Sequence, residues 1–318
     1  MGRLAPRDFV PRLYVTPGLG SLMRAVYYRW GLMLAAQIVG FDAASRAARM
    51  GGRFLWKHIP LFRDEIRRTI AAAFDTTPDD LRVEAIARAH ATDLWRYHLE
   101  TEFIHRLIRP GSWRRFVRCV GTERLIDAIR RGRGVVGAGV YLGSHQAGMT
   151  ALGCLLGGRV AGIVSPMQYS TQRRWMAGMV RRRLAKLYPR GDAIGNSLRA
   201  LREGRLLLVI AEHKAGGKTG VETEFLGQRL RVPTSVAMLA WRTRCPIAVL
   251  TCTRREQPFT FEIRLHDWME PPARGHRAWL ADTTLRVTRS LEAAIREHPE
   301  QYAWVHRHLV AGRDRAAT

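Results

Sequence analysis

A histidine that follows a short apolar stretch is the side chain in this sequence best placed to do chemistry. The segment GVVGAGVYLGSHQAGMT, residues 134–150, passes from a predicted strand into a glycine-punctuated turn that carries Ser144 and His145. Strand ends are where α/β enzymes keep their reactive groups, and an imidazole there suits a general base. Such a base normally has a carboxylate nearby to fix its tautomer, but this turn contains no acidic residue.

A glutamate follows a second predicted strand in the same way. Glu212 comes directly after Leu206–Ala211, just as the turn with His145 follows Val135–Val140. Because the carboxyl ends of parallel strands converge on one crevice, we interpret Glu212 as the acid that supports His145. The alternative is a solvated glutamate at a strand end. Lys214 lies just beyond it in a basic loop with two adjacent glycines, which we interpret as a mobile lid over the substrate.

These residues need a sheet that brings strand ends together, and the second part of the chain has the pattern of one. Short apolar runs alternate there with longer stretches of helix formers, which is typical of a covered, largely parallel sheet. The predicted strands are Val135–Val140, Val160–Ser165, Leu206–Ala211 and Ile247–Cys252, with Phe259–Leu265 as an edge strand; the predicted helices are Thr171–Leu187, Asn196–Glu203, Pro233–Arg242 and Asp282–Glu297. The fold class is therefore α/β, with a central mostly parallel or mixed sheet covered by helices over residues 121–318.

Residues 1–120 are predicted to form a helical N-terminal appendage. Thr77 as an N-cap, Pro78 at the first helical position and the acids after it predict a helix that runs to about Leu107. Within Ser21–Phe41, aromatic side chains stand beside arginines, and the uninterrupted apolar part is too short to cross a bilayer. This pattern suits a helix lying on a membrane surface, and the alternative is a buried first helix.

The chain of 318 residues is strongly basic. It has 52 Lys plus Arg against 27 Asp plus Glu, a formal charge of +25, which favours anionic partners such as a phospholipid surface, an acidic carrier protein or a phosphate. A general bias of the composition toward arginine is the alternative. No nucleic-acid-binding module is recognisable, so we expect no nucleic-acid partner.

Three further expectations come from what the sequence lacks. The four cysteines have no metal-ligand spacing, so we expect no metal. No nucleotide-binding fingerprint is present, and we expect no cofactor. The first twenty residues lack the apolar core of a secretory signal, so we expect a cytoplasmic protein, with peripheral attachment to the inner face of the cell membrane if the surface helix binds lipid.

Four segments, in this order, carry a resemblance to a known family. They are GSHQAGMT, LREGRLLLVIAEHKAGGKTGVETEFLG, RVPTSVAMLAWRTRCPIAVL and PEQYAWVHRHL. Together they resemble the lysophospholipid acyltransferase superfamily, and most closely the late acyltransferases of bacterial lipid A biosynthesis and the phosphatidylinositol mannoside acyltransferases. The resemblance covers roughly residues 134–309.

The resemblance implies an acyltransferase that moves an acyl group from acyl carrier protein or coenzyme A to a hydroxyl or amine. The acceptor would be a lipid, or a carrier-bound or specialised metabolite. His145 takes the position of the family's general base, while Thr150 occupies the place of the family's acid. A hydroxyl cannot offset an imidazolium charge, and the related mannoside acyltransferases use an acid in the later block, where Glu212 stands. A non-catalytic relative that binds acyl chains or membranes is the alternative, because the usual acid is missing.

Several residues are predicted to contact the substrate. Ser144 and Gly148 share the turn with His145, and Lys214 lies in the loop after Glu212. Arg173 and Arg174 begin the densest cationic stretch, which suits a phosphate group, the alternative being a solvated helix face. By resemblance Phe225 and Gly227 border the acyl tunnel, and the alternative for them is packing under a turn.

Overall fold

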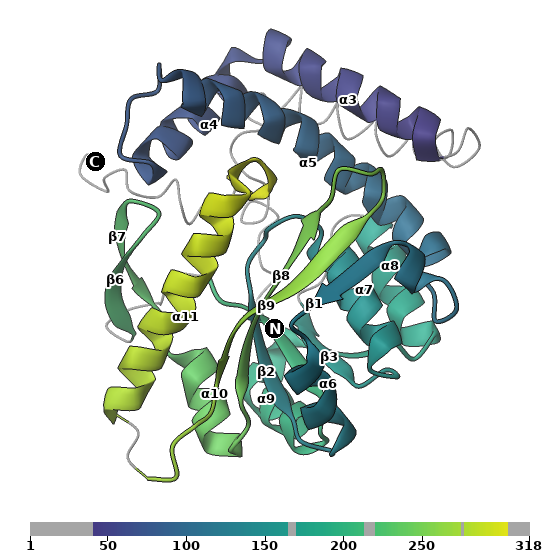
Figure 1. The fold of residues 1–318 in the computed structure, drawn as a ribbon, viewed down its shortest axis with the longest axis vertical. Coiled ribbons are helices and arrows are strands. Elements are labelled where there is room, and N and C mark those ends of the chain that lie inside the picture. Colours follow the sequence, from purple (N-terminus) through teal and green to yellow (C-terminus); the bar gives the residue numbers. More distant parts are fainter. Residues whose placement is uncertain (1–40, 165–169, 213–219, 275–276, 305–318) are drawn as a thin grey trace. The chain divides into compact units, whose positions relative to one another are not determined.

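The computed structural model describes residues 41–164, 170–212, 220–274 and 277–304 (Figure 1). Within them the chain divides into two compact units. The first unit contains residues 41–99, 226–228 and 303–304, and the second contains the other described residues. The division near residue 120 that the sequence predicts remains a proposal.

Long helices make up most of the described part of the first unit. They are α3 (Phe41–His58), α4 (Pro60–Ala73) and the first part of α5 (Leu81–Leu107), whose residues from Glu100 onward belong to the second unit. Pro60 begins α4 at a position where its missing N–H group costs no helical hydrogen bond. Gly52 lets α3 approach α5 closely, because a Cβ atom there would lie 2.5 Å from the Cα atom of Thr92.

The start of α5 differs from the prediction, although its end at Leu107 agrees. Asp80, and not Thr77, precedes the first helical residue. One carboxylate oxygen of Asp80 accepts the backbone N–H of Arg82 at 2.7 Å, and the other accepts the hydroxyl of Thr76 at 2.8 Å. A carboxylate that accepts an N–H group two residues further on is a good helix cap, so the helix begins after Asp80 and the Thr77–Pro78 pair stays in the preceding turn.

A seven-stranded sheet is the centre of the second unit. Its order is β1-β9-β8-β2-β5-β3-β4, and neighbours run parallel except for the antiparallel pair β8 and β9. The strands span Val117–Val120 (β1), Val135–Gly139 (β2), Val160–Val164 (β3), Ala185–Pro189 (β4), Leu206–Ile210 (β5), Ile247–Arg254 (β8) and Phe261–Met269 (β9). This mixed, mostly parallel sheet with its helices confirms the predicted α/β class (Figure 1).

The remaining described elements surround this sheet. They are α6 (Glu123–Arg130), α7 (His145–Leu155), α8 (Ser170–Arg181), α9 (Ala193–Arg202), α10 (Ser235–Thr243), α11 (Arg277–Glu297), the hairpin of β6 (Val221–Phe225) and β7 (Gln228–Val232), and the 3-10 turns η3 (Trp113–Arg115), η4 (Arg190–Asp192) and η5 (Pro299–Gln301). Strand β8 is buried along its whole length, as a strand at the centre of a covered sheet requires.

Two predicted elements were wrong in extent or place. The helix predicted to reach Leu187 ends at Arg181, because Arg183 takes a left-handed conformation with φ of 55° and the chain then enters β4. The strand predicted at the sheet edge, β9, lies inside the sheet, because β1 pairs with its other side. Among the described residues, no helix combines the length and apolar composition needed to span a bilayer. Apart from Phe41, the predicted membrane-surface segment lies outside the described residues.

Candidate active site

His145 is the first residue of helix α7, just beyond the end of strand β2. Ser144 caps this helix from a fully buried position, and its side-chain oxygen accepts the N–H of Ala147 at 3.4 Å. Gly148 lies where α7 crosses strand β8. A Cβ atom at Gly148 would come within 2.7 Å of the Cβ of Cys252, so a glycine is needed for this close contact between helix and strand.

Four consecutive backbone N–H groups hold the turn between β2 and α7. Gly143 has φ of 61°, and a Cβ atom there would lie 2.2 Å from the backbone oxygen of Cys252, so the turn requires glycine at this position. The four bonds run from Tyr141 to a side-chain oxygen of Glu212 (3.1 Å), and from Leu142, Gly143 and Ser144 to the backbone oxygens of Val140 (2.8 Å), Gln301 (3.0 Å) and Cys252 (2.9 Å). The turn that carries His145 is therefore fixed by contacts from three other parts of the chain.

Glu212 lies beyond the end of β5, the strand that pairs in parallel with β2. The pairing aligns Ile210 with Gly139, so both strands end at the same edge of the sheet. The side chain of Glu212 is only 2% exposed. One of its oxygens accepts the N–H of Tyr141, and the other accepts the hydroxyl of Tyr302 at 2.5 Å.

Tyr141 links this carboxylate to the histidine. Its backbone binds Glu212, while its ring meets the His145 imidazole edge to face, with 5.0 Å between the ring centroids. Burial and the nearby charge of Glu212 raise the pKa of Tyr141, and the same two causes with the hydrogen bond to Glu212 raise the pKa of Tyr302. Tyr302 is therefore protonated at neutral pH and donates its hydroxyl hydrogen to the carboxylate.

Thr150 uses its hydroxyl within the packing of two helices. It donates to the backbone oxygen of Gln146 at 2.7 Å, and it accepts the indole N–H of Trp175 on α8 at 2.9 Å. The side chain is buried. These bonds commit its single hydroxyl hydrogen to the helix that carries it.

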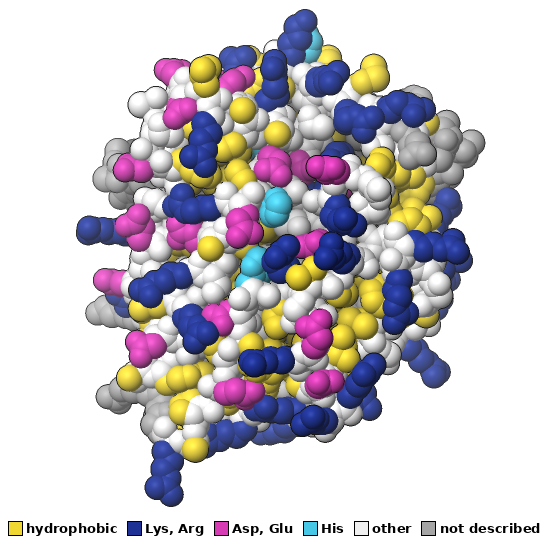
Figure 2. Space-filling model, in the orientation of Figure 1, with side chains coloured by type: hydrophobic (Ala, Val, Ile, Leu, Met, Phe, Trp, Pro, Cys, Tyr) yellow, Lys and Arg dark blue, Asp and Glu magenta, His cyan; other side chains and the backbone are white. Residues whose placement is uncertain are grey.

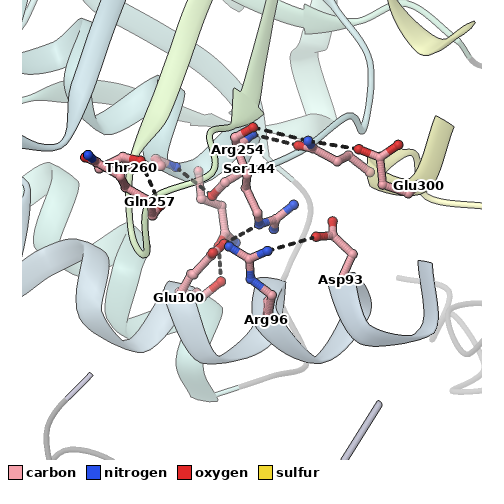
Figure 3. A network of polar contacts seen from close by, with 12 residues as sticks. Asp93, Arg96, Glu100, Ser144, Arg254, Gln257, Thr260 and Glu300 are labelled. Carbon is pink, nitrogen blue, oxygen red and sulfur yellow. Dashed lines mark hydrogen bonds and ion pairs between the residues drawn. The ribbon is translucent and has the colours of Figure 1, made fainter. Parts of the chain in front are cut away.

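Three consecutive buried residues of α5 hold three elements around the histidine turn. Glu100 accepts from the guanidinium of Arg254, at the end of β8, at 2.7 Å (Figure 3). Thr101 donates its hydroxyl to the side chain of Gln146 on α7 at 2.5 Å. Glu102 accepts from Arg174 on α8 at 3.0 and 3.1 Å. Sequence reasoning missed all three α5 residues, although charged residues among the apolar positions of a long helix are a signal for buried pairing.

The segment after α11 fastens the same edge of the sheet. The Gln301 side chain accepts the N–H of Arg254 at 2.6 Å and donates to the backbone oxygen of Arg254 at 3.2 Å. Tyr302 forms a backbone bridge to Leu142 in the histidine turn, in addition to its bond with Glu212. The sequence pointed to this segment only through the resemblance of PEQYAWVHRHL.

The other predicted substrate residues lie in several places. Arg174 is paired with Glu102 while its side chain stays 55% exposed. Phe225 is buried at the end of β6, and Gly227 follows in the tight turn with φ of 70°. A Cβ atom at Gly227 would lie 2.1 Å from the backbone oxygen of Ala72, so this glycine packs against the end of α4. Lys214 and the side chain of Arg173 lie outside the described residues.

Over the part of the chain that the structure describes, no group of His, Cys, Asp and Glu side chains is arranged to hold a metal ion. The described polar groups at the end of β2 and β5 are an imidazole, a buried carboxylate and two tyrosines. This set provides proton transfer and electrostatic stabilisation.

Comparison with known proteins identifies the family to which the chain belongs. The family described as bacterial lipid A biosynthesis acyltransferase matches residues 21–310. The crystal structure of the 1-acyl-sn-glycerophosphate acyltransferase PlsC from Thermotoga maritima is 10% identical, with a TM-score of 0.38 over 79% of this chain and 97% of that chain. No curated protein sequence matches significantly. Because the family match covers most of the chain, the protein belongs to the bacterial lipid A biosynthesis acyltransferase family and is an acyltransferase of lipid biosynthesis.

Proposed function

We propose that the chain transfers an acyl group from a thioester, carried by acyl carrier protein or coenzyme A, to a hydroxyl or amine with His145 as the general base. The acceptor is a lipid or a related carrier-bound or specialised metabolite, reached at the inner face of the cell membrane. The observation that carries this proposal is the position of His145 at the start of α7, with its ring against Tyr141 and the buried Glu212 at the end of the neighbouring strand.

The chemistry follows from this placement. The imidazole of His145 takes the proton of the acceptor hydroxyl or amine, whose oxygen or nitrogen then attacks the thioester carbonyl carbon. The tetrahedral intermediate carries an oxyanion, which the N–H groups at the positive end of α7 stabilise. When the intermediate collapses, the carbon–sulfur bond breaks and the thiolate receives the proton from the imidazolium. The base is thereby returned to its neutral form.

Glu212 supplies the negative charge that Thr150 cannot. A carboxylate held in a buried site favours a positive charge that forms nearby, because a low dielectric weakens Coulomb interactions less than water does. The N–H of Tyr141 and the hydroxyl of Tyr302 each donate to one oxygen of Glu212, so both oxygens have a partner that holds the carboxylate in place. Tyr141 thus holds Glu212 through its backbone while its ring contacts the ring of His145.

The predicted contacts to the donor complete the proposal. Arg174, anchored on the buried Glu102 but exposed for about half its surface, is held in a fixed place to meet a phosphate. The sequence patterns also assign Arg173 and Lys214 to the substrate, and by resemblance Phe225 and Gly227 border the acyl chain. Ser144 and Gly148 act on the substrate only through the turn that they stabilise.

The test measures acyl transfer from radiolabelled acyl carrier protein and acyl coenzyme A to a panel of lipid and small hydroxyl or amine acceptors. His145→Ala should lower the transfer rate by roughly 10²-fold or more, while thermal unfolding stays close to wild type because the residue lies at a turn. His58→Ala, which removes an exposed imidazole at the end of α3, is the matched control and should keep the wild-type rate with a water-soluble acceptor. A folded His145→Ala variant with the wild-type rate would remove the proposed base.

A further inference from the structure

The outward side of helix α3 carries cationic and apolar side chains that have no part in the proposed catalytic chemistry. Residues 46, 49, 53 and 57 recur at the spacing of one helical stripe, and all four are cationic and exposed: Arg46, Arg49, Arg53 and Lys57. Met50 and Phe54, one turn apart, form an apolar stripe beside it. They are 68% and 62% exposed, which is unusual for such large apolar side chains.

The side of α3 that lies opposite Met50 and Phe54 fixes the helix in place. Ser45, Gly52 and Trp56 are buried, and Gly52 lies against the backbone of α5 at Thr92. Met50 and Phe54 are therefore exposed although α3 itself is packed against another helix. In Figure 2 dark blue side chains follow the course of α3, with yellow side chains between them.

The charges of α3 differ from those of the next helix. On α4 the three arginines each have a carboxylate partner: Arg63 with Asp64, Arg67 with Asp79 and Glu84, and Arg68 with Glu65. No ion pair joins any of the four α3 cations to a described side chain, and Arg49 donates to the hydroxyl of Ser45 at 3.3 Å. The acid of α3, Asp42, has a side chain outside the described residues. A general excess of arginine does not explain this contrast, because both helices are rich in it.

We propose that α3 is a docking surface for an anionic lipid bilayer, on which it lies parallel to the membrane plane. The four cations meet the lipid headgroups, and Met50 and Phe54 enter the boundary between headgroups and acyl chains. A cationic stripe beside an apolar stripe on one exposed helix face matches this environment, because it provides both the electrostatic and the hydrophobic attraction that interfacial helices need. None of these residues belongs to the elements that carry His145 and Glu212, so the surface concerns where the enzyme works and not its chemistry.

The test uses the full-length protein in a flotation assay with vesicles of phosphatidylcholine alone or with phosphatidylglycerol. One variant replaces Arg46, Arg49, Arg53 and Lys57 by glutamine. A second variant carries Met50→Ser and Phe54→Ser. The matched control replaces four exposed cations elsewhere, Arg118, Arg124, Arg130 and Arg131, by glutamine and so loses the same charge.

We expect the α3 glutamine variant to bind anionic vesicles at least tenfold more weakly than wild type, because each cation near an anionic surface contributes roughly a fivefold factor. The control should stay within about twofold, and the serine variant should weaken binding at every salt concentration. Equal losses in the α3 variant and the control would overturn the proposal, as would wild-type binding by the α3 variants. Unchanged vesicle binding with weaker binding of acidic acyl carrier protein would assign the surface to that protein instead.

Two controls separate this proposal from the catalytic one. Acyl transfer to a water-soluble acceptor should be the same in all these variants, because none of the substituted residues lies at the His145 turn. The unfolding temperature of each variant should match wild type, since the substituted side chains are exposed. The proposal requires that the α3 variants no longer bind the bilayer but keep their activity on the soluble acceptor and their unfolding temperature.

Discussion

Removal of a single oxygen tests how firmly the carboxylate of Glu212 is held. Tyr302→Phe deletes the hydroxyl that Glu212 accepts at 2.5 Å and keeps the aromatic ring. Both side chains are buried, so water does not replace the lost donor. A hydrogen bond to a charged group contributes about 1.5–3 kcal/mol, and we expect the free energy of unfolding to fall by that amount. No cavity adds to the loss, because the ring volume is unchanged.

Chemical denaturation of four proteins provides the measurement. The set is wild type, Tyr302→Phe, Glu212→Gln and the double variant, which together form a double-mutant cycle. Because the two groups touch, their effects should deviate from additivity by at least about 1 kcal/mol. Tyr188→Phe, a buried tyrosine on the edge strand β4, is the matched control and should lose less than about 1 kcal/mol.

The same variants report on catalysis. If Glu212 stabilises the protonated His145, loosening it by Tyr302→Phe should lower kcat by about tenfold with little change in KM. Additive effects within about 0.5 kcal/mol, together with wild-type kcat, would refute the reasoning. The bond between Tyr302 and Glu212 would then have no part in the reaction.

Three further outcomes are expected. Glu212→Gln should lower turnover by roughly 10²- to 10⁴-fold, whereas Thr150→Ala should change turnover little; a silent Glu212→Gln with strong activation by Thr150→Glu would reverse the two assignments. Gly143→Ala should destabilise the fold by about 1–3 kcal/mol, because its φ of 61° and the 2.2 Å approach to Cys252 exclude a side chain, and a neutral result in denaturation would contradict this. Burial lowers the pKa of His98 to about 4, below its ordinary 6.5, so the stability that this histidine contributes should be complete above pH 6.5 and lost as the pH falls toward 4; a flat profile over that interval, or the same slope in His98→Gln, would disprove it.

The sequence was a good guide to the strands at the centre of the sheet. Strands β2 and β5 are runs of apolar residues, and each was predicted to within one residue of its end. Strand β8 extends two residues beyond its predicted end. The prediction missed Thr253 and Arg254 because they are polar, although both are buried in the structure. Their burial depends on partners elsewhere in the chain, which a local pattern does not contain.

The misplaced elements have the same cause. Strand β1 has only four residues, with an arginine among them, so its pairing with β9 has no strong local signal. The end of α8 depends on the left-handed conformation of Arg183, which is uncommon for a residue other than glycine. The amino-acid composition after Arg181 favours a longer helix, so the sequence pattern does not show where α8 ends.

For the candidate site, the rule that parallel strand ends converge was sufficient to place His145 and Glu212 at one edge of the sheet. The residues that orient them were not predictable in this way. Tyr302 is 90 positions from Glu212, and Gln301 acts on the backbone of Arg254, so neither role leaves a pattern of spacing. Such contacts exist only once the chain has folded.

The three consecutive α5 residues that hold β8, α7 and α8 restrict how this helix can vary in evolution. Successive positions of a helix point about 100° apart, so an insertion or deletion of one residue before Glu100 would turn all three side chains away from their partners. The pair of Glu100 with Arg254 would break inside the protein, at a cost of about 3–5 kcal/mol. Relatives should therefore tolerate changes of residue type along the rest of α5 but keep its length, and insertions should accumulate in the loops that follow it.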